Sequence, residues 1–142
     1  MSAKMSLAEA IRLGSLIMKP LAHAICNDDW TKGCALGMAM KATGHNKKDI
    51  LIWEKFKEEY PILDFSVAYP PCSCRHCANE ALWHHNRLDH IIASTFNHHV
   101  EGDKTWTLDQ LVEWVAAIER DFVPTETPKA EQPAQNEVLV NA

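Results

Sequence analysis

The stretch Cys34-Ala35-Leu36-Gly37-Met38-Ala39-Met40 is apolar on nearly every side of the helix that it is expected to form. A helix that is apolar all round is usually buried, so we expect this one at the centre of the core. Its small residues would let another helix approach closely, although Gly37 inside a helix costs about 1 kcal/mol relative to alanine. Gly44 stands where a glycine commonly ends a helix.

Four further helices are predicted from apolar residues that recur at helical spacing. The first and the last of them begin with a capping-box pattern, in which a serine or threonine is followed three residues later by a glutamate or glutamine. Three of them end at or just before a proline, which cannot continue a helix. They run from Ser6 to about Met18, from Asp49 to Tyr60, from Asn79 to about His98, and from Thr107 to Phe122.

Two connecting segments have patterns of their own. Residues 21–26 follow Pro20 and are expected to continue as a second short helical turn. Residues 62–71 alternate weakly between apolar and polar side chains and end in two prolines. Proline cannot donate to a sheet, so this segment is expected as a loop or a short edge strand.

The length and composition of the chain indicate one globular domain. It has 142 residues, of which 46% are apolar and 23% are charged. We therefore expect a mainly α fold: a compact bundle of about five helices over residues 1–123, with one loop held by a metal ion. Residues 124–142 contain three prolines and no aromatic residue, and we expect them to form a disordered tail.

The charge and the cysteine count narrow the classes of protein to which the chain can belong. A net charge of −5 offers no attraction to phosphate, which disfavours non-specific binding of nucleic acid. No stretch approaches the roughly 20 apolar residues of a membrane span, and the first residues do not resemble a secretory signal. Five cysteines, three of them clustered, fit a reducing compartment better than a disulfide framework. We expect a cytoplasmic protein.

The cysteine cluster Cys72-Ser-Cys74-Arg-His-Cys77 makes a bound zinc ion the leading hypothesis. Zinc takes four ligands in a tetrahedron, from thiolate sulfur and imidazole nitrogen. A Cys-x-x-Cys turn, here Cys74 to Cys77, brings two sulfurs to one ion with little strain. Cys72 lies just outside that turn and supplies a third sulfur.

Three histidines are candidates for the fourth ligand. His90 follows Cys77 at a spacing like that of a zinc finger, whereas His98 and His99 lie at the predicted end of the helix. On one straight helix His90 and His98 would be about 12 Å apart, so both cannot bind the same ion. We favour His99, because the chain can fold back at the helix end, and predict the set Cys72, Cys74, Cys77 and His99.

A thiol–disulfide redox protein is the alternative in another class. The sequence Cys74-Arg-His-Cys77 resembles a redox motif, and a helix N-terminus lowers the pKa of a thiol. The redox fold, however, places that motif in a βαβ unit, and here helices are predicted on both sides. Haem attachment would require a histidine directly after the second cysteine, where this chain has Ala78. No glycine-rich phosphate loop and no His-Glu-x-x-His motif occur.

Several separated patches resemble a group of small uncharacterised bacterial and phage-borne proteins. The shared patches are Ala-Glu-Ala-Ile-Arg-Leu-Gly at 8–14, Cys-Ala-Leu-Gly at 34–37, the mid-chain Cys-x-x-Cys, and Trp106-Thr107 with Gln110 and Trp114-Val115. The resemblance implies no activity. Members often carry His-Leu-Asn-Asp-x-His after the cysteines; this chain has Thr95-Phe96-Asn97-His98-His99 instead, which favours Cys72 as a replacement ligand.

A site in which all four ligands come from the protein leaves no position open for water, and such sites are structural. The sequence therefore predicts a zinc-stabilised accessory or regulatory protein that binds a protein partner and is not a catalyst. The redox alternative would use Cys74 and Cys77.

Overall fold

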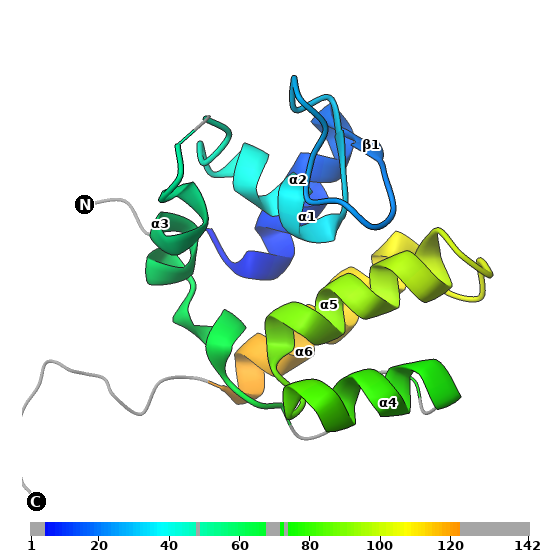
Figure 1. The fold of residues 1–142 in the computed structure, drawn as a ribbon. Helices are drawn as coiled ribbons and strands as arrows, with labels where there is room; N and C mark the ends of the chain where they lie inside the picture. The colour runs from blue at the N-terminus through cyan, green and yellow to red at the C-terminus, as the bar shows by residue number, and fades with distance from the viewer. Residues whose placement is uncertain (1–4, 48, 68–71, 73, 123–142) are drawn as a thin grey trace, which may run out of the picture.

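The computed structural model describes residues 5–47, 49–67, 72 and 74–122, and these form a mainly helical fold, as predicted (Figure 1). The predicted tail at 124–142 lies outside the described residues. In chain order the elements are α1 (Leu7–Ile17), β1 (Lys19–Pro20), β2 (Lys32–Gly33), α2 (Ala35–Ala42), α3 (Ile52–Glu59), the 3₁₀ helix η1 (Pro61–Asp64), α4 (Arg75–His84), α5 (Leu88–Thr95), the π-helix η2 (Phe96–Val100) and α6 (Leu108–Asp121). None of the described helices combines the length and the apolar character needed to cross a membrane.

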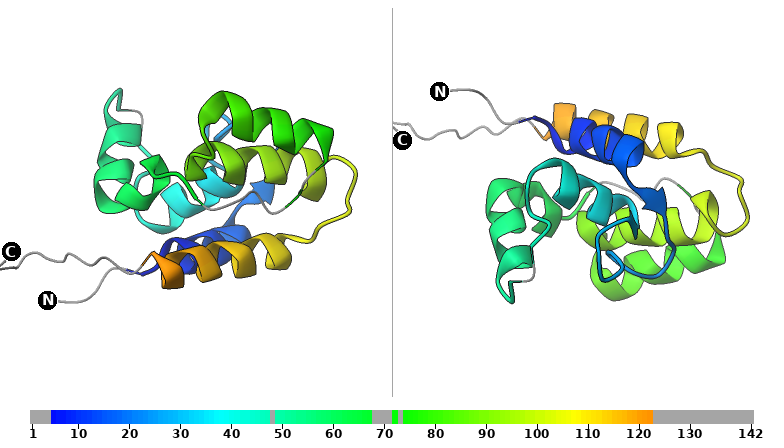
Figure 2. Two further views of the ribbon diagram at one scale, coloured as in Figure 1. Left: turned by 90° about the horizontal axis from the view of Figure 1, so that it is seen from below. Right: turned by 90° about the horizontal axis from the view of Figure 1, so that it is seen from above.

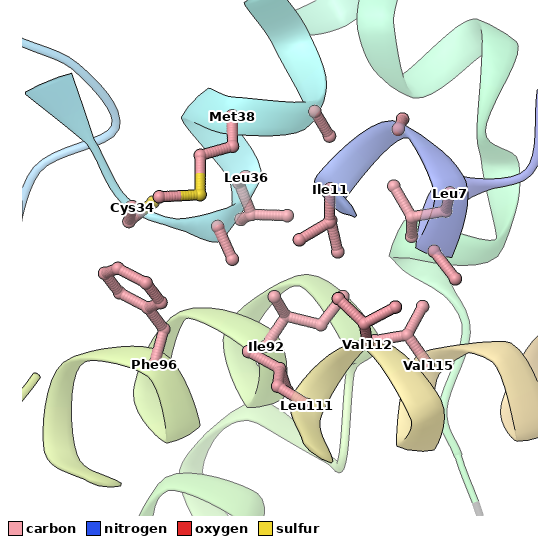
Figure 3. Packing of buried hydrophobic residues seen from close by; sticks show 14 of the residues in the cluster. Leu7, Ile11, Cys34, Leu36, Met38, Ile92, Phe96, Leu111, Val112 and Val115 are labelled. Carbon is pink, nitrogen blue, oxygen red and sulfur yellow. The ribbon is translucent and has the colours of Figure 1, made fainter. Parts of the chain in front are cut away.

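The helices form two layers around one core. Helices α1 and α6 lie side by side in one layer, and α2 to α5 lie on the other side (Figure 2). Side chains from both layers meet between them: Ile11 of α1 and Val112 of α6 come from one layer, and Leu36 of α2 and Ile92 of α5 come from the other (Figure 3). Each large aliphatic side chain buried in this way contributes roughly 1.5–3 kcal/mol.

Helices α1 and α6 are joined where a side chain of α6 caps the first turn of α1. The Ser6 hydroxyl accepts the N–H of Glu9 at 3.0 Å, as the capping pattern predicts. The carboxylate of Glu119, near the end of α6, accepts the N–H groups of Leu7 and Ala8 at 2.7 and 2.9 Å. A carboxylate at a helix N-terminus pairs with otherwise unsatisfied donors and with the helix dipole, so α6 stabilises the start of α1.

Helix α2 is buried at the centre, as predicted, but its close contacts differ from those expected. A Cβ atom added to Gly14 of α1 would lie 2.0 Å from the carbonyl oxygen of Met38, so it is Gly14 that lets α1 approach α2. A Cβ on Gly37 would lie 1.7 Å from the carbonyl oxygen of Ile25. Gly37 therefore packs against the chain before α2, not against a helix.

Residues 21–26, predicted as a helical turn, form an irregular segment. Strands β1 and β2 pair in parallel, with Lys19 opposite Lys32, and the segment returns to the start of α2, where the Cys34 N–H donates to the Ala24 carbonyl at 3.0 Å. His23 has a left-handed backbone, with φ of 67°. The Leu21 N–H donates to the Gly33 carbonyl, and the His23 N–H donates to Oδ1 of Asn97. Backbone groups of this segment are thus paired with distant residues, an arrangement that helical propensity does not report.

The single helix predicted over 79–98 is two helices that form a hairpin. The break lies at His85 and Asn86, which have left-handed φ angles of 54° and 57°. Residues 65–67 pair with this turn: the Val67 N–H donates to the Asn86 carbonyl and the Leu88 N–H donates to the Phe65 carbonyl, both at 3.0 Å. The hairpin lays α4 along α5, so that the beginning of α4 lies near the end of α5 (Figure 1).

Candidate metal centre

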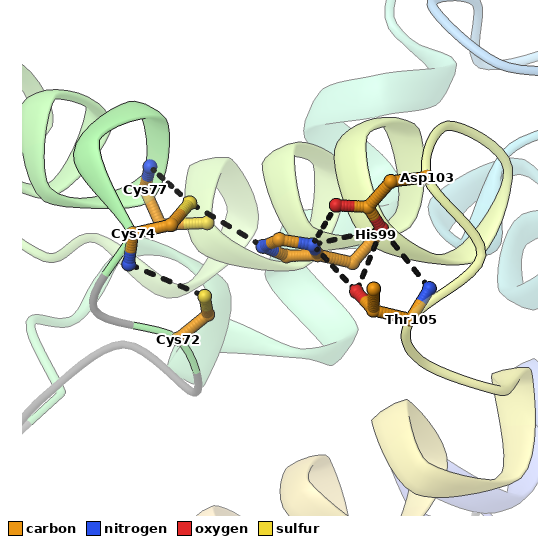
Figure 4. A network of polar contacts seen from close by, with 6 residues as sticks. All are labelled: Cys72, Cys74, Cys77, His99, Asp103 and Thr105. Carbon is orange, nitrogen blue, oxygen red and sulfur yellow. Dashed lines mark hydrogen bonds and ion pairs between the residues drawn. The ribbon is translucent and has the colours of Figure 1, made fainter.

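The hairpin brings the three clustered cysteines to His99. Cys72 precedes α4, Cys74 immediately precedes its first residue, Cys77 lies in its first turn, and His99 lies in η2. One ligand atom from each of the four lies within 4.8 Å of the others. Figure 4 shows the three sulfurs on one side of the imidazole ring. These four residues lie close enough to bind a metal ion.

Backbone N–H groups stabilise thiolate charge in the cluster. The Cys74 N–H donates to the sulfur of Cys72 at 3.3 Å, and the Cys77 N–H donates to the sulfur of Cys74 at 3.5 Å. The second bond is the main reason why the pKa of Cys74 is lowered to about 7. Burial, and then the neighbouring sulfur of Cys74, raises the pKa of Cys77 to about 12.

His99 is held in the orientation that a metal ligand requires. Its Nε2 lies 3.5 Å from the sulfur of Cys74. Its Nδ1 lies 3.1 Å from the nearer oxygen of Asp103 and 3.0 Å from the hydroxyl of Thr105 (Figure 4). An ionised carboxylate can only accept, so we infer that Nδ1 carries the proton. The lone pair of Nε2 then points toward the sulfurs, and the ring is oriented from behind by a carboxylate, as metal-binding histidines usually are.

Asp103 is charged at neutral pH. The Thr105 hydroxyl donates to its Oδ1 at 2.6 Å and the Thr105 N–H donates to the same atom at 3.0 Å. These bonds, with a smaller contribution from His99, lower the pKa of the Asp103 carboxyl to about 2. The sequence predicts neither Asp103 nor Thr105 as a site residue. An acidic residue four positions after a histidine is a weak signal for Asp103, and it gains meaning only when His99 is known to be the ligand; no sequence signal marks Thr105.

The other two candidate histidines lie elsewhere. The His98 ring stacks on His76 with 4.4 Å between ring centroids, and its ligand atoms group with those of His99 and Asp103, not with the sulfurs. The His90 ring stacks on His84 at 3.7 Å. Of the three histidines left open by the sequence, the structure brings His99 to the three cysteines. The wide turn of η2, with the Glu101 N–H donating to the Phe96 carbonyl, sets the direction of His99.

The cysteines outside the cluster behave as small core residues. Cys34 is buried at the start of α2 and Cys26 is half-buried against the core. Within the described residues, neither belongs to a group that could hold a metal. This agrees with the expectation that a lone thiol is more often a small hydrophobe than a ligand.

Comparison of the chain with protein-family models, with curated proteins and with solved structures finds no match in any of the three.

Proposed function

We propose that Cys72, Cys74, Cys77 and His99 bind one zinc ion, and that the protein is a zinc-stabilised accessory or regulatory protein that binds a protein partner. The observation that carries this proposal is the position of His99, whose Nε2 faces the sulfurs while its Nδ1 is held by Asp103. Three thiolates and one imidazole are a usual ligand set of structural zinc, and they leave no position open for a substrate. In such a site two sulfurs lie roughly 3.8 Å apart, because each Zn–S bond is about 2.3 Å long. The four ligand atoms would therefore need to move only slightly closer together to bind one ion.

The packing of α4 explains why the fold would use a metal. Among the described side chains of α4, Cys77 is the buried one, at 2% exposure. The helix has 10 residues, and isolated helices shorter than about 12–15 residues are marginal in water. A helix with so little core contact needs another anchor. A metal ion bound by its first turn and by η2 would hold it against α5.

The exposed face of α4 supports a role in binding a protein. Leu82 and Trp83 are 72% and 77% exposed, next to each other in the second half of the helix. Tryptophan is enriched where one protein binds another, because its large rigid ring contributes binding energy at a low entropic cost. We propose that zinc fixes the helix that presents this pair to a partner.

We expect the zinc affinity to depend on Asp103 as well as on the four direct ligands. We expect Asp103→Asn to weaken zinc affinity about 10–100-fold, because the substituted amide carries no charge to hold the His99 ring or to balance the ion. Glu101→Gln is the matched control: it neutralises a carboxylate two residues earlier, whose contact is an ion pair with Lys104 at 3.8 Å. Competition with a chelating dye measures both. Equal affinities in the two variants would show that Asp103 has no part in metal binding.

A thiol–disulfide redox protein is the second candidate, and one observation favours it. Cys74 has a pKa of about 7 and Cys77 a pKa of about 12, so one thiol of the pair ionises near neutral pH while the other stays protonated. A reactive low-pKa thiol beside a buried resolving thiol is the arrangement of disulfide oxidoreductases. The third cysteine and His99 next to Cys74 favour zinc, which would occupy both sulfurs.

One experiment separates the two candidates. In protein purified without chelator, we expect the thiols of Cys72, Cys74 and Cys77 to be alkylated only after a chelator is added, and we expect no acceleration of insulin reduction. Peptide mapping distinguishes these thiols from the half-buried Cys26, which serves as the internal control. Fast alkylation of Cys74 without chelator, together with turnover of insulin disulfides, would replace the zinc proposal by the redox one.

A further inference from the structure

One face of α1 carries apolar side chains that do not reach the core. Leu13, Leu16 and Ile17 lie three and four positions apart on the helix, and they are 37%, 76% and 55% exposed. The outer face of a surface helix is usually polar. A single exposed leucine is ordinary, but residues at this spacing are neighbours on the helix surface, and contiguous apolar patches often mark a binding surface.

The last residues of this patch line a groove at the end of α1, where strand β1 follows the helix (Figure 2). The groove has a volume of about 560 Å³ and is called the α1–β1 groove. Leu16 and Ile17 line it together with Lys19 of β1 and Lys32 of β2. Its remaining described lining residues carry no charge: Ser15, Met18 and Thr31. The charge of its described lining is therefore entirely positive.

The two lysines of the α1–β1 groove are neighbours. Lys19 lies opposite Lys32 in the parallel pairing of β1 with β2, and both residues are exposed. Paired strands are about 4.8 Å apart, so the two side chains begin close together. Like charges placed opposite each other on paired strands repel. In the described part of the chain the ion pairs of lysine are formed by other lysines, and neither Lys19 nor Lys32 has one.

The acidic residues nearest to this pair along the chain do not neutralise it. Asp28 and Asp29 lie shortly before β2. Oδ1 of Asp29 accepts the hydroxyl of Thr31 at 2.7 Å and the Thr31 N–H at 3.2 Å. Within the described residues, neither aspartate is paired with a lysine. In a chain whose net charge is −5, these two ammonium groups thus remain available to an acidic group from outside.

The combination of positive charge with apolar surface indicates the class of ligand. Carboxylates bound between the lysines would replace repulsion by attraction. Nucleic acid fits poorly, because the net charge of the chain repels phosphates. Binding to anionic lipids typically uses clusters of about 4–8 basic residues, whereas the described lining of this groove has two. A protein segment that combines acidic with apolar side chains matches both features of the groove.

We propose that the α1–β1 groove binds an acidic, apolar segment of another protein. The carboxylates of the segment lie against Lys19 and Lys32, and its apolar side chains pack on Leu16 and Ile17. Helix α1 belongs to one layer of the fold and α4 to the other (Figure 2). The groove is therefore a second protein-binding surface, separate from the exposed face of α4. It contains none of the four proposed zinc ligands, so binding there does not depend on zinc.

Three synthetic peptides of equal length, blocked at both ends, test the proposal. Glu-Leu-Asp-Leu-Leu combines acidic with apolar residues, Lys-Leu-Lys-Leu-Leu reverses the charges, and Glu-Ser-Asp-Ser-Ser removes the apolar side chains. Titration of the full chain, followed by amide chemical shifts in NMR spectra, should give saturable changes at residues 15–19 and 31–32 with the first peptide. The other two should bind at least about tenfold more weakly, because each lacks one of the two contributions.

A charge swap tests whether the lysines hold the acidic side chains. Lys19→Glu/Lys32→Glu should weaken binding of the acidic peptide at least about tenfold, and the variant should instead prefer the basic peptide, because attraction and repulsion are exchanged. Lys47→Glu/Lys104→Glu is the matched control. It changes the net charge equally at two lysines that do not line the groove, and it should keep the preference of the wild type.

A second substitution tests the apolar contact. Leu16→Ser should weaken binding of the acidic peptide about 3- to 10-fold, the effect of losing part of a buried leucine. Ile50→Ser is its control, because Ile50 is 95% exposed and does not line the groove. Absence of saturable binding, equal affinity for the acidic and basic peptides, or wild-type affinity in both Lys19→Glu/Lys32→Glu and Leu16→Ser would each overturn the proposal.

Three further measurements test other occupants of the groove. We expect no saturable changes with single-stranded oligothymidylate, and no dependence of the groove signals on protein concentration. Residues 137–140 of this chain, Glu-Val-Leu-Val, have the chemistry of the proposed segment. Glu137→Lys, without added peptide, should nevertheless leave the groove signals unchanged. Changes in the first, second or third measurement would assign the groove to nucleic acid, to a second copy of the chain or to its own residues 137–140, and each would overturn the proposal.

Discussion

The double substitution Cys74→Ser/Cys77→Ser is expected to lower the metal content of the protein from close to one zinc per chain to near zero. Two of the four proposed ligands are lost, and a serine hydroxyl does not replace a thiolate on zinc. In small zinc-binding domains the ion contributes about 10–16 kcal/mol to folding. In this protein, loss of the ion should destabilise α4 first, because Cys77 is the buried residue among the described side chains of that helix.

Elemental analysis and amide hydrogen exchange measure this effect. Exchange in residues 75–84 should become fast in the variant, and its thermal midpoint should fall by about 10 °C or more. Cys26→Ser is the control, since it removes a half-buried thiol outside the cluster and should leave the zinc content unchanged. A wild-type protein that is fully folded without metal would contradict the prediction.

Substitutions at Gly14 and Gly37 in the core should lower the stability of the protein nearly as much. A Cβ atom at Gly37 would meet the Ile25 carbonyl oxygen at 1.7 Å, and one at Gly14 would meet the Met38 carbonyl oxygen at 2.0 Å. Both obstacles are backbone atoms, which cannot move aside as a side chain can. We expect Gly14→Ala and Gly37→Ala each to lower the free energy of unfolding by about 3 kcal/mol or more, and Gly37→Leu to lower it further.

The matched control for these glycines is Gly44→Ala. Gly44 has a left-handed φ of 82° and nothing within 4 Å of an added Cβ, so its substitution should cost about 1–2 kcal/mol through backbone strain alone. Equilibrium unfolding in urea compares the three alanine variants. If Gly37→Ala lowers the free energy of unfolding no more than Gly44→Ala does, then α2 does not pack closely against residues 23–25.

The sequence predicts those parts of the fold that local signals determine. In α6 both halves of the predicted capping box form: the Thr107 hydroxyl accepts the Gln110 N–H at 3.1 Å, and the Gln110 side chain accepts the Thr107 N–H at 2.8 Å. Helix α2 is buried because it is apolar on nearly every side. In these elements, propensity, capping and burial all favour the same structure.

The α4–α5 hairpin could not be predicted in the same way. Its turn uses His85 and Asn86 in left-handed conformations, with no glycine or proline to mark it. Histidine and asparagine tolerate this conformation better than most residues, but they do not require it. The turn is held by Val67 and Phe65, about 20 residues away, and such long-range contacts leave no local pattern.

This difference also explains how much of the metal site the sequence predicts. The three cysteines are neighbours in the chain, so their spacing alone indicates a ligand cluster. The choice among His90, His98 and His99 depends on where the hairpin turns and on the direction that η2 gives to His99. Asp103 becomes recognisable as a supporting residue only when the ring of His99 is in place.

X-ray absorption at the zinc edge, on protein purified without chelator, tests the central claim most directly. Binding by Cys72, Cys74, Cys77 and His99 predicts three sulfur neighbours at about 2.3 Å and one nitrogen neighbour at about 2.0 Å. The nitrogen contribution should disappear in His99→Ala and persist in His90→Ala. A shell of light atoms alone, or a nitrogen contribution that survives His99→Ala, would contradict the assignment.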